Sequence, residues 1–326
     1  MKILANIICL NSAPELPKLL KSLEGHFDGL IAIDGGSTDD TVAVISNWGL
    51  ATGTPVTVKT NPWPDDFALQ RNICLDATRE KYGVADAEDV WVLAIDSDDA
   101  LVSFDRPYIE KAAAGCGIVG LQCRMDNGNG FYHVTQFFRV TANTCWCNPI
   151  HEFVETHGPK GLPPIGTLTI KRGRSKQHDR DPERNVRIGR TFVESNPNDS
   201  RGRFYLARDL TECEAIPLVR RLAEAEGHLR TYLAMPGVFL TQDRYALLLL
   251  VGVLCDGGRR EEAKRLLLDS LANDPDNKSA YEALSRLSDD KQVGVWHRLS
   301  AAAEGTCVLP YSSKLPAKLE STPALT

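Results

Sequence analysis

Short apolar, β-rich runs alternate with segments of helical spacing through the first hundred residues, and this alternation limits the fold more than any other feature. We expect strands over 3–10, 29–34, 54–60 and 90–96, with helices between them over 13–27, 37–49 and 66–83. A helix between two strands returns the chain so that both strands run the same way. Two further strand-like runs, 117–125 and 131–140, follow without a helix and predict a hairpin. The pattern predicts an α/β, Rossmann-like fold, a mostly parallel sheet with an added hairpin.

The second half of the chain changes character, because strand signals stop after about Asn185 and helical patterns take over. Between 244 and 275 two amphipathic helices flank Gly257 and Gly258, and Pro275 closes a unit of tetratricopeptide-compatible spacing. We therefore expect three parts: an α/β domain over 1–190, an all-α, tetratricopeptide-like domain over 191–304, and an extended or disordered tail over 305–326. We expect the helical domain to be a structural cap on the α/β domain, a recognition surface or a homodimer interface.

Composition excludes some classes of function. The net charge of −6 gives no general attraction to nucleic acid or to an anionic membrane. No run of about eighteen apolar residues occurs, so we expect no membrane span. The nine cysteines lie singly, without a Cys-x-x-Cys pair, which indicates reduced thiols and a cytoplasmic location. A basic stretch from Lys171 to Arg190 is the local exception, and it keeps a nucleic-acid partner open as a minor alternative.

Three carboxylates crowd the end of the fourth expected strand. The stretch WVLAIDSDD places Asp96, Asp98 and Asp99 directly after five apolar residues. Carboxylates this close repel one another and raise one another's pKa, and a divalent cation removes that penalty. Hard oxygen ligands suit Mg²⁺ or Mn²⁺, which also bind substrate phosphates. The cluster predicts a seat for a metal–diphosphate complex, and the alternative is a helix cap on a solvated turn.

Two other polar corners fall on the same predicted edge. Asp34 and Gly35 open the stretch DGGSTDDT after the second strand, where glycines allow close backbone approach. The third helix begins near Asp65 and Asp66 and carries Arg71, a side chain suited to phosphate or base. Ligands of parallel sheets bind beyond the carboxyl ends of the strands. The corners therefore predict one binding crevice, although Arg71 in a surface ion pair with either aspartate is the alternative.

These motifs, taken together, resemble a known family. Asn11, then DGLIAIDGGSTDDT, then WPDDFALQRN, then WVLAIDSDD occur in the order seen in family 2 glycosyltransferases with a GT-A fold. More narrowly, the chain is similar to the bacterial subgroup with a tetratricopeptide-like helical C-terminal part. The resemblance covers about residues 1–100 and continues more weakly through Phe138–Arg139 and 150–154.

The resemblance implies roles at the matching positions. Asp98 would hold the metal on the diphosphate, and Asp96 would face the ribose of the donor. The remaining donor-binding positions would be Cys9, Leu10, Asn11, Asp34, Gly35, Arg71 and Ser97. Many members carry a second acid where this chain has Gly35, and that acid contacts uracil. Uridine is therefore the expected base without being fixed by the sequence.

Glycosyl transfer that inverts the anomeric centre needs a base for the acceptor proton. Glu152, after the hairpin, is the candidate, with His151 orienting it or contacting phosphate; a helix-capping pair is the alternative, and Asp99 and Asp126 are competing acids. His178, in the basic loop after a late strand, is a candidate ligand of the metal or contact of the diphosphate. An exposed loop histidine is the alternative there.

The preferred interpretation is a glycosyltransferase that uses Mn²⁺ or Mg²⁺, inverts the anomeric centre and takes a nucleotide-diphosphate sugar, with UDP expected. The acceptor stays open among peptide, glycan and modified nucleobase. One alternative is a sugar-phosphate nucleotidyltransferase, but NSAPELPK after the first strand lacks the Gly-rich basic loop of such enzymes. The other is a non-catalytic helical-repeat adaptor, and the intact Asp96, Asp98, Arg71 and Glu152 argue against it.

Overall fold

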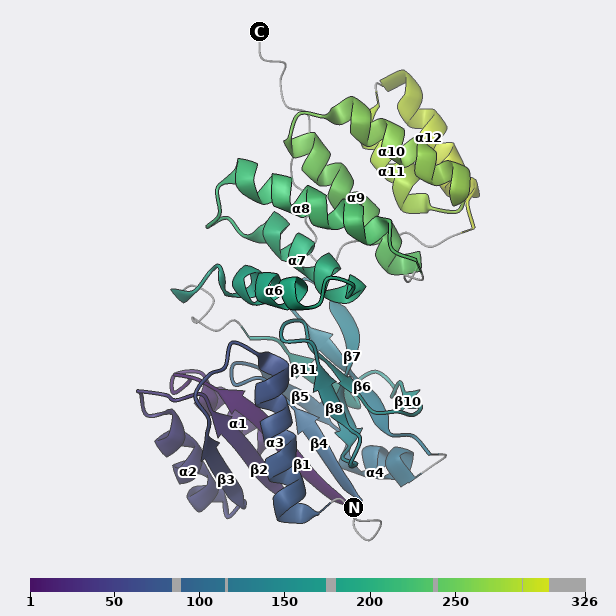
Figure 1. Cartoon of the computed structure of the whole chain (residues 1–326). Coiled ribbons are helices and arrows are strands. Elements are labelled where there is room, and N and C mark those ends of the chain that lie inside the picture. The colour runs from purple at the N-terminus through teal and green to yellow at the C-terminus, as the bar shows by residue number, and fades with distance from the viewer. Residues whose placement is uncertain (84–88, 115–116, 174–179, 237–239, 289, 305–326) are drawn as a thin grey trace. The chain divides into compact units, whose positions relative to one another are not determined.

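The structure is a computed structural model that describes residues 1–83, 89–114, 117–173, 180–236, 240–288 and 290–304. The chain divides into two compact units, Met1–Asp181 and Pro182–Thr326 (Figure 1). The first unit ends at Asp181, whereas we expected the α/β domain to extend to residue 190. The expected tail over 305–326 lies outside the described residues.

A single large sheet organises the first unit. Its strands are β1 (Lys2–Cys9), β2 (Gly29–Asp34), β3 (Val56–Thr60), β4 (Val90–Ala94), β5 (Ala100–Phe104), β6 (Gly120–Asp126), β7 (Phe131–Arg139), β10 (Lys160–Gly161) and β11 (Leu168–Lys171). They lie in the order β3-β2-β1-β4-β7-β6-β11-β5, with β10 beside β6. The first four are parallel, and β6 and β7 form the expected hairpin. The predicted α/β sheet with an added hairpin is confirmed.

Strand direction decides which loops meet. β7 runs antiparallel to β4, and β6 runs antiparallel to β7, so β6 points the same way as β4. β11 is parallel to β6. The carboxyl ends of β1, β2, β4, β6 and β11 therefore share one edge of the sheet. Segments that follow these strands are brought together there although they lie far apart in sequence.

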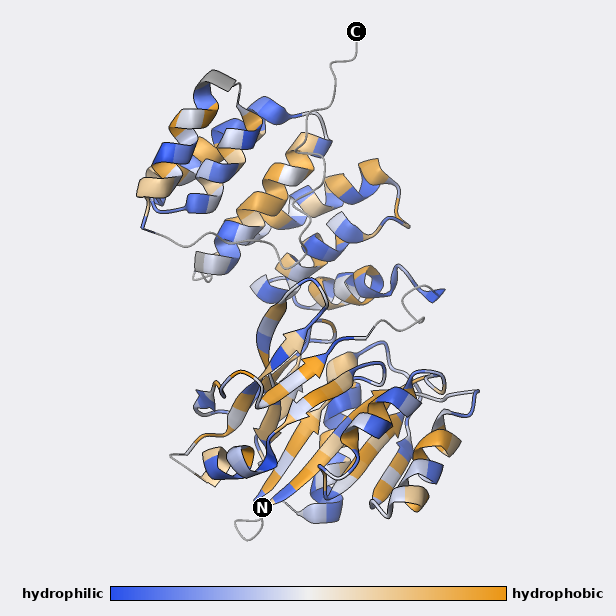
Figure 2. Ribbon diagram, turned by 180° about the vertical axis from the view of Figure 1, so that it is seen from behind, coloured by the Kyte–Doolittle hydropathy of each residue, from blue (hydrophilic) through white to orange (hydrophobic). Residues whose placement is uncertain are grey.

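Helices cover both faces of this sheet, because its buried strands carry apolar side chains on both sides. The helices are α1 (Leu16–Leu23), α2 (Thr41–Thr52), α3 (Phe67–Tyr82) and α4 (Arg106–Ala114). Ile3 and Ile7 of β1 share a core with Leu20 of α1, whereas the alternate residue Leu4 packs with Leu75 of α3. Figure 2 shows the strands of the sheet as mostly hydrophobic. Such burial on both faces is typical of parallel sheets.

Several elements of the first unit have no counterpart among the strands and helices expected from the sequence. β5 and α4 follow the acid cluster, and β10 lies between the hairpin and β11. A separate two-stranded antiparallel sheet joins β8 (Cys145–Cys147) to β9 (Phe153–Glu155). Strands of three residues carry too little periodicity to be recognised. This small sheet matters because β8 packs against α3 beside the candidate site.

The second unit is helical in its described part. Its helices are α6 (Arg184–Ser195), α7 (Ser200–Glu212), α8 (Leu218–Leu233), α9 (Leu240–Asp256), α10 (Arg260–Asn273), α11 (Lys278–Leu287) and α12 (Asp290–Ala302). Consecutive helices pack on one another around a single core that extends from Val186 to Leu287. Gly257 and Gly258 separate α9 from α10 as expected, and Gly258 adopts φ +76°. The expected helical C-terminal part is confirmed, and its tetratricopeptide-like class stays a prediction.

None of the described helices combines the length and the apolar character that a transmembrane helix requires.

Candidate active site

An acidic cluster lies where β4 ends. Oxygen atoms of Asp96, Asp98 and Asp99 all lie within 4.8 Å of one another, and among the described residues no other such group of three ligands occurs. The expected seat for a cation is therefore a compact set of carboxylates. Such hard oxygen donors fit Mg²⁺ or Mn²⁺. Asp98 and Asp96 would offer ligands from the partly exposed side, whereas Asp99 is buried.

Arg71 bridges this cluster to the predicted base. Its Nη2 donates to Oδ1 of Asp96 over 2.5 Å, and its Nε donates to Oε1 of Glu152 over 2.8 Å. The arginine is only 5% exposed. The alternative of a surface ion pair with Asp65 or Asp66 is wrong, since Asp66 instead caps α3 by accepting from the main-chain N–H of Leu69. A buried guanidinium thus fixes the two carboxylates relative to each other.

A second arginine, Arg172, enters the cluster from β11. Its Nη1 donates to Oδ2 of Asp96 over 2.8 Å and to Oδ2 of Asp99 over 3.1 Å. The next residue, Gly173, donates its main-chain N–H to Oδ1 of Asp99 over 2.9 Å. A Cβ at Gly173 would lie 1.8 Å from the carbonyl oxygen of Asp98, so only glycine fits there. The end of β11 therefore builds one wall of the acidic cluster.

The arginines set the charge states of the carboxylates. Burial would raise the pKa of Asp96, but the positive charges of Arg71 and Arg172 outweigh it and hold the pKa well below its usual range. Burial, together with the negative charge of Asp96, raises the pKa of Asp99 against the opposing effect of Arg172. Asp96 is therefore the firmly ionised member, and Asp99 is the member that resists ionisation.

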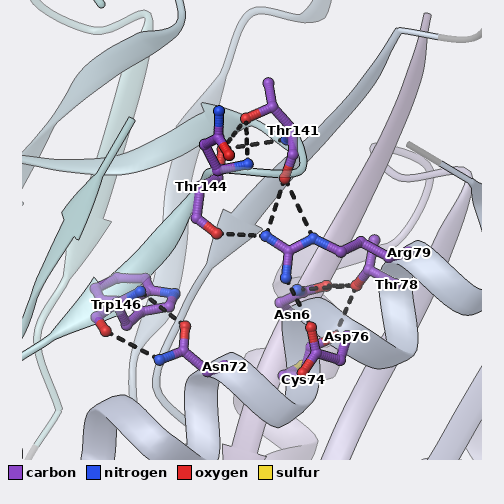
Figure 3. A network of polar contacts seen from close by, with 10 residues as sticks. Asn6, Asn72, Cys74, Asp76, Thr78, Arg79, Thr141, Thr144 and Trp146 are labelled. Carbon is purple, nitrogen blue, oxygen red and sulfur yellow. Dashed lines mark hydrogen bonds and ion pairs between the residues drawn. The ribbon is translucent and has the colours of Figure 1, made fainter. Parts of the chain in front are cut away.

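Arg71 is itself held by β8. Its guanidinium carbon lies 4.9 Å from the centre of the Trp146 ring, a cation–π contact. Asn72 then clamps the main chain of Trp146: its Nδ2 donates to the Trp146 carbonyl over 2.9 Å, and its Oδ1 accepts from the Trp146 N–H over 2.8 Å (Figure 3). Two turns further along α3, Arg79 donates to the carbonyls of Thr141 and Thr144. The helix thus pins the 141–146 segment over the arginine.

The corner after β2 is tied to the end of β1. Asn11, in the left-handed region at φ +47°, accepts from the N–H of Thr38 over 2.8 Å and donates its own N–H to Ser37 Oγ over 2.8 Å. Asp34 is 2% exposed, and its carboxylate accepts from the N–H groups of Gly36 and Ser37 and from Ser37 Oγ. The carboxylate of Asp34 thus organises its own turn.

The remaining predicted donor-binding residues lie in the same corner. The N–H of Gly35 donates to the carbonyl of Cys9 over 2.8 Å. The hydroxyls of Ser97 and Ser12 are 3.0 Å apart, which connects the end of β4 to the loop after β1 that also contains Leu10. Cys9 is buried, and burial followed by the charge of Asp34 raises the pKa of its thiol to about 12. Its sulfur is therefore an inert neighbour.

The remaining candidate residues are those expected to act on the acceptor or to complete the metal site. Glu152 reaches Arg71, and the preceding His151 adopts φ +51°, a left-handed conformation that few non-glycine residues take. Of the competing acids, Asp99 is 1% exposed, and Asp126 uses Oδ1 to accept the N–H of Gly128 in the hairpin turn. His178 lies outside the described residues.

Sequence reasoning missed two residues that build this site. Apart from its being a tryptophan, nothing in the sequence indicated that Trp146 belongs to the site. Arg172 was noted only as one of several basic residues after a strand. The signal that could have singled it out is its position, directly after an apolar strand whose carboxyl end meets that of β4.

The fold and the site together define a class. A mostly parallel sheet with an added hairpin, an acidic cluster at the end of β4 and a corner of tight turns after β2 are the features of a GT-A glycosyltransferase domain. Residues 6–151 match the sequence model of glycosyl transferase family 2. This match lies within the first unit, and it agrees with the family that the resemblance implied.

Two curated proteins are similar to the first part of this chain. The chain is 26% identical over 157 residues to the SPbeta prophage-derived glycosyltransferase SunS of Bacillus subtilis, and 31% identical over 153 residues to a TPR repeat-containing protein of Synechococcus elongatus. Each alignment covers 46% of this chain and 34% of the relative, so the chain matches about a third of the length of these curated relatives.

Solved structures of similar fold are more distant in sequence. Staphylococcus aureus TarS 1–349 in complex with UDP is 13% identical, with a TM-score of 0.41, covering 92% of this chain and 87% of that one. The mannosyltransferase PcManGT from Pyrobaculum calidifontis, with GDP-Man and Mn²⁺, is 12% identical, with a TM-score of 0.42, covering 92% and 86%.

Proposed function

We propose that this protein is a metal-dependent glycosyltransferase that moves a sugar from a nucleotide-diphosphate sugar to an acceptor hydroxyl or amine, with inversion at the anomeric carbon. One observation carries the proposal. Arg71 joins an acidic cluster at the end of β4 to Glu152, in a domain of glycosyl transferase family 2. Arg71 thus contacts both a carboxylate of the candidate cation site and the candidate base.

The donor end of the reaction would be served by the edge of the sheet. Asp98 would hold Mg²⁺ or Mn²⁺, which would neutralise the leaving diphosphate, and Asp96 in the same cluster would face the ribose of the donor. The loops of Cys9 to Asn11 and of Asp34 to Gly35 would surround the base, and Ser97 would contact the donor. UDP is the expected nucleotide, and His178 would complete the diphosphate site from the loop after β11.

The acceptor end would be served by Glu152. The acceptor atom attacks the anomeric carbon, the bond from that carbon to the diphosphate oxygen breaks with its electron pair, and the acceptor proton passes to Glu152. Geometry favours Glu152 over its competitors, because Asp99 is buried and held by Gly173 and Arg172, and Asp126 is engaged in its turn. His151 would orient Glu152 or contact phosphate.

The acceptor itself is proposed only as a class: a peptide side chain, a glycan end or, less favoured, a modified nucleobase. The helical second unit would supply acceptor recognition or a homodimer interface. The buried apolar side chains of its helices pack around a common core, so recognition or dimerisation would use the exposed positions of these helices.

Release of UDP from a panel of UDP-sugars, without acceptor and then with candidate acceptors, tests the reaction. We expect Mn²⁺-dependent release by the wild-type chain. The Glu152→Gln variant should lose about 100-fold or more in turnover while UDP affinity changes less than about threefold, because a general base contributes to the reaction and not to donor binding.

The matched control is Glu155→Gln, three residues along on β9, where the side chain is 40% exposed and faces away from Arg71 in the ladder. It should retain full turnover. Equal turnover in Glu152→Gln and wild type would remove Glu152 as the base. Pyrophosphate exchange with UTP and a sugar phosphate, but no release from UDP-sugars, would instead indicate the nucleotidyltransferase alternative.

A further inference from the structure

Two arginines neutralise the acidic cluster, and they are held very differently. Arg71 uses Nε and Nη2 on two separate carboxylates, is 5% exposed and lies under the Trp146 ring. Arg172 contacts both of its carboxylates through the single nitrogen Nη1, and about a third of its side chain, 35%, is exposed. Arg71 is therefore held from several sides, whereas Arg172 is held through one nitrogen and is partly open to solvent.

The position of Arg172 Nη1 is informative. It lies 2.8 Å from Oδ2 of Asp96 and 3.1 Å from Oδ2 of Asp99, between two members of the group whose oxygens lie within 4.8 Å of one another. A divalent cation placed among these three acids would use the same oxygens. A guanidinium and a metal ion are both positively charged, and they repel one another strongly when they lie this close in a partly buried site.

The main chain would stay in place if the side chain moved. The N–H of Arg172 donates to the carbonyl of Asp126 over 2.8 Å at the end of the β11–β6 ladder, and Gly173 keeps its own bond to Asp99. Within the described part of the chain, Nε and Nη2 of Arg172 make no hydrogen bond or ion pair that competes with a new one. The guanidinium fork suits a diphosphate, which it can bind with two parallel hydrogen bonds.

We infer that Arg172 is an exchangeable internal cation: its guanidinium and the divalent metal compete for the oxygens of Asp96 and Asp99, and the displaced guanidinium then binds the donor diphosphate. The inference rests on the proposed function for its second half only. Competition between Arg172 and a metal for carboxylates concerns the protein alone and does not require any nucleotide to bind.

Binding of Mn²⁺ alone tests the competition. The loss of the free-ion signal in electron paramagnetic resonance gives the affinity for the full chain without nucleotide. We expect Arg172→Gln to bind Mn²⁺ about tenfold more tightly than wild type, because the competing charge is gone. Arg172→Lys should lie between them, since lysine keeps the positive charge on a shorter side chain whose ammonium group lies further from the carboxylates. The neighbouring exposed Lys171→Gln is the control and should match wild type.

An Mn²⁺ affinity in Arg172→Gln that equals wild type or falls below it would overturn the inference, because Arg172 would then be shaping the acids for the metal. If Arg172→Gln fails to fold, the Mn²⁺ affinity of Arg172→Lys is compared with wild type by the same criterion. A second titration, with UDP at saturating Mn²⁺, should show Arg172→Gln weakened about tenfold. UDP binding of unchanged strength would overturn the diphosphate half. Failure of wild type to bind UDP would count against the proposed function, while the Mn²⁺ comparison would still decide the competition.

Discussion

At the scale of single residues, the candidate site depends on how Arg71 is compensated. The arginine is buried, yet its two hydrogen-bonded nitrogens reach two carboxylates and its face lies against Trp146. A charge this deep is tolerated only when it is paired and hydrogen-bonded. The same pairing places Glu152 and Asp96 at a fixed separation, so the residue that stabilises the local fold also arranges the proposed chemistry.

Removing that arginine should be costly. Arg71→Met leaves Glu152 without its partner and Asp96 with Arg172 alone, and we expect the free energy of unfolding in urea to fall by about 3 kcal/mol. Arg139→Met is the matched control, because Arg139 pairs with Asp89 in an exposed ion pair with side chains 43% and 33% exposed. It should cost no more than about 1 kcal/mol. Equal losses in the two variants would contradict a structural role for the buried pair.

At the scale of elements, α3 and β8 form one functional piece. Asn72 satisfies both main-chain groups of Trp146, as a neighbouring strand would, and Arg79 holds the segment before it. β8 has only three residues and pairs with a strand of equal length, so its position depends on the helix. The placement of Trp146 over Arg71 therefore follows from polar side chains of α3.

Asn72→Ala should loosen this piece. Two hydrogen bonds disappear and two main-chain groups of Trp146 lose their partners, which we expect to reduce the free energy of unfolding by about 2 kcal/mol. Tryptophan emission should shift as Trp146 gains freedom. Asn47→Ala, at an exposed position of α2, is the control and should leave both readouts within error. Unchanged emission and stability in Asn72→Ala would show that β8 holds its place without the clamp.

In the second unit, one ion pair joins α6 to α8. Nε and Nη2 of Arg190 donate to Oε1 and Oε2 of Glu224, each over 2.7 Å. These hydrogen bonds lower the pKa of Glu224. A depressed folded pKa adds stability above the unfolded pKa of about 4.3, and that stability is lost as the pH falls through the folded pKa.

Glu224→Gln should therefore have a pH-dependent effect. We expect it to reduce the free energy of unfolding by about 1 kcal/mol at pH 7, with the difference from wild type shrinking as the pH falls below about 4.3. Urea titrations followed by circular dichroism at several pH values measure this. Glu194→Gln, exposed on α6, is the control and should stay within about 0.5 kcal/mol of wild type at pH 7. A difference between Glu224→Gln and wild type that does not change with pH would contradict the assignment.

At the scale of the whole molecule, the sequence predicted what depends on local pattern. The strand ends carrying Asp34 and Asp96 were placed correctly, because each follows a buried apolar run, and so was the hairpin of β6 and β7. Arg172 could not be placed, because its proximity to Asp96 depends on β7, β6 and β11 being added in that order beside β4. Spatial order of strands is decided by the whole sheet and leaves little trace in any one strand.

The two units of the chain have separate apolar cores. One cluster of buried residues surrounds the sheet of the first unit, and another lies among the helices of the second unit. The proposed donor chemistry uses side chains of the first unit alone, so it can be tested before any acceptor is known.

Calorimetric titration of the full chain with UDP, with and without Mn²⁺, tests the central claim most directly. The account predicts micromolar binding that requires Mn²⁺ and falls at least about tenfold in Asp98→Ala, since that change removes a ligand of the metal on the diphosphate. Thermal unfolding of the variant should match wild type, because Asp98 is partly exposed at the end of β4. UDP binding that ignores both Mn²⁺ and the loss of Asp98, or no binding of UDP, GDP, CDP or dTDP under either condition, would contradict the account.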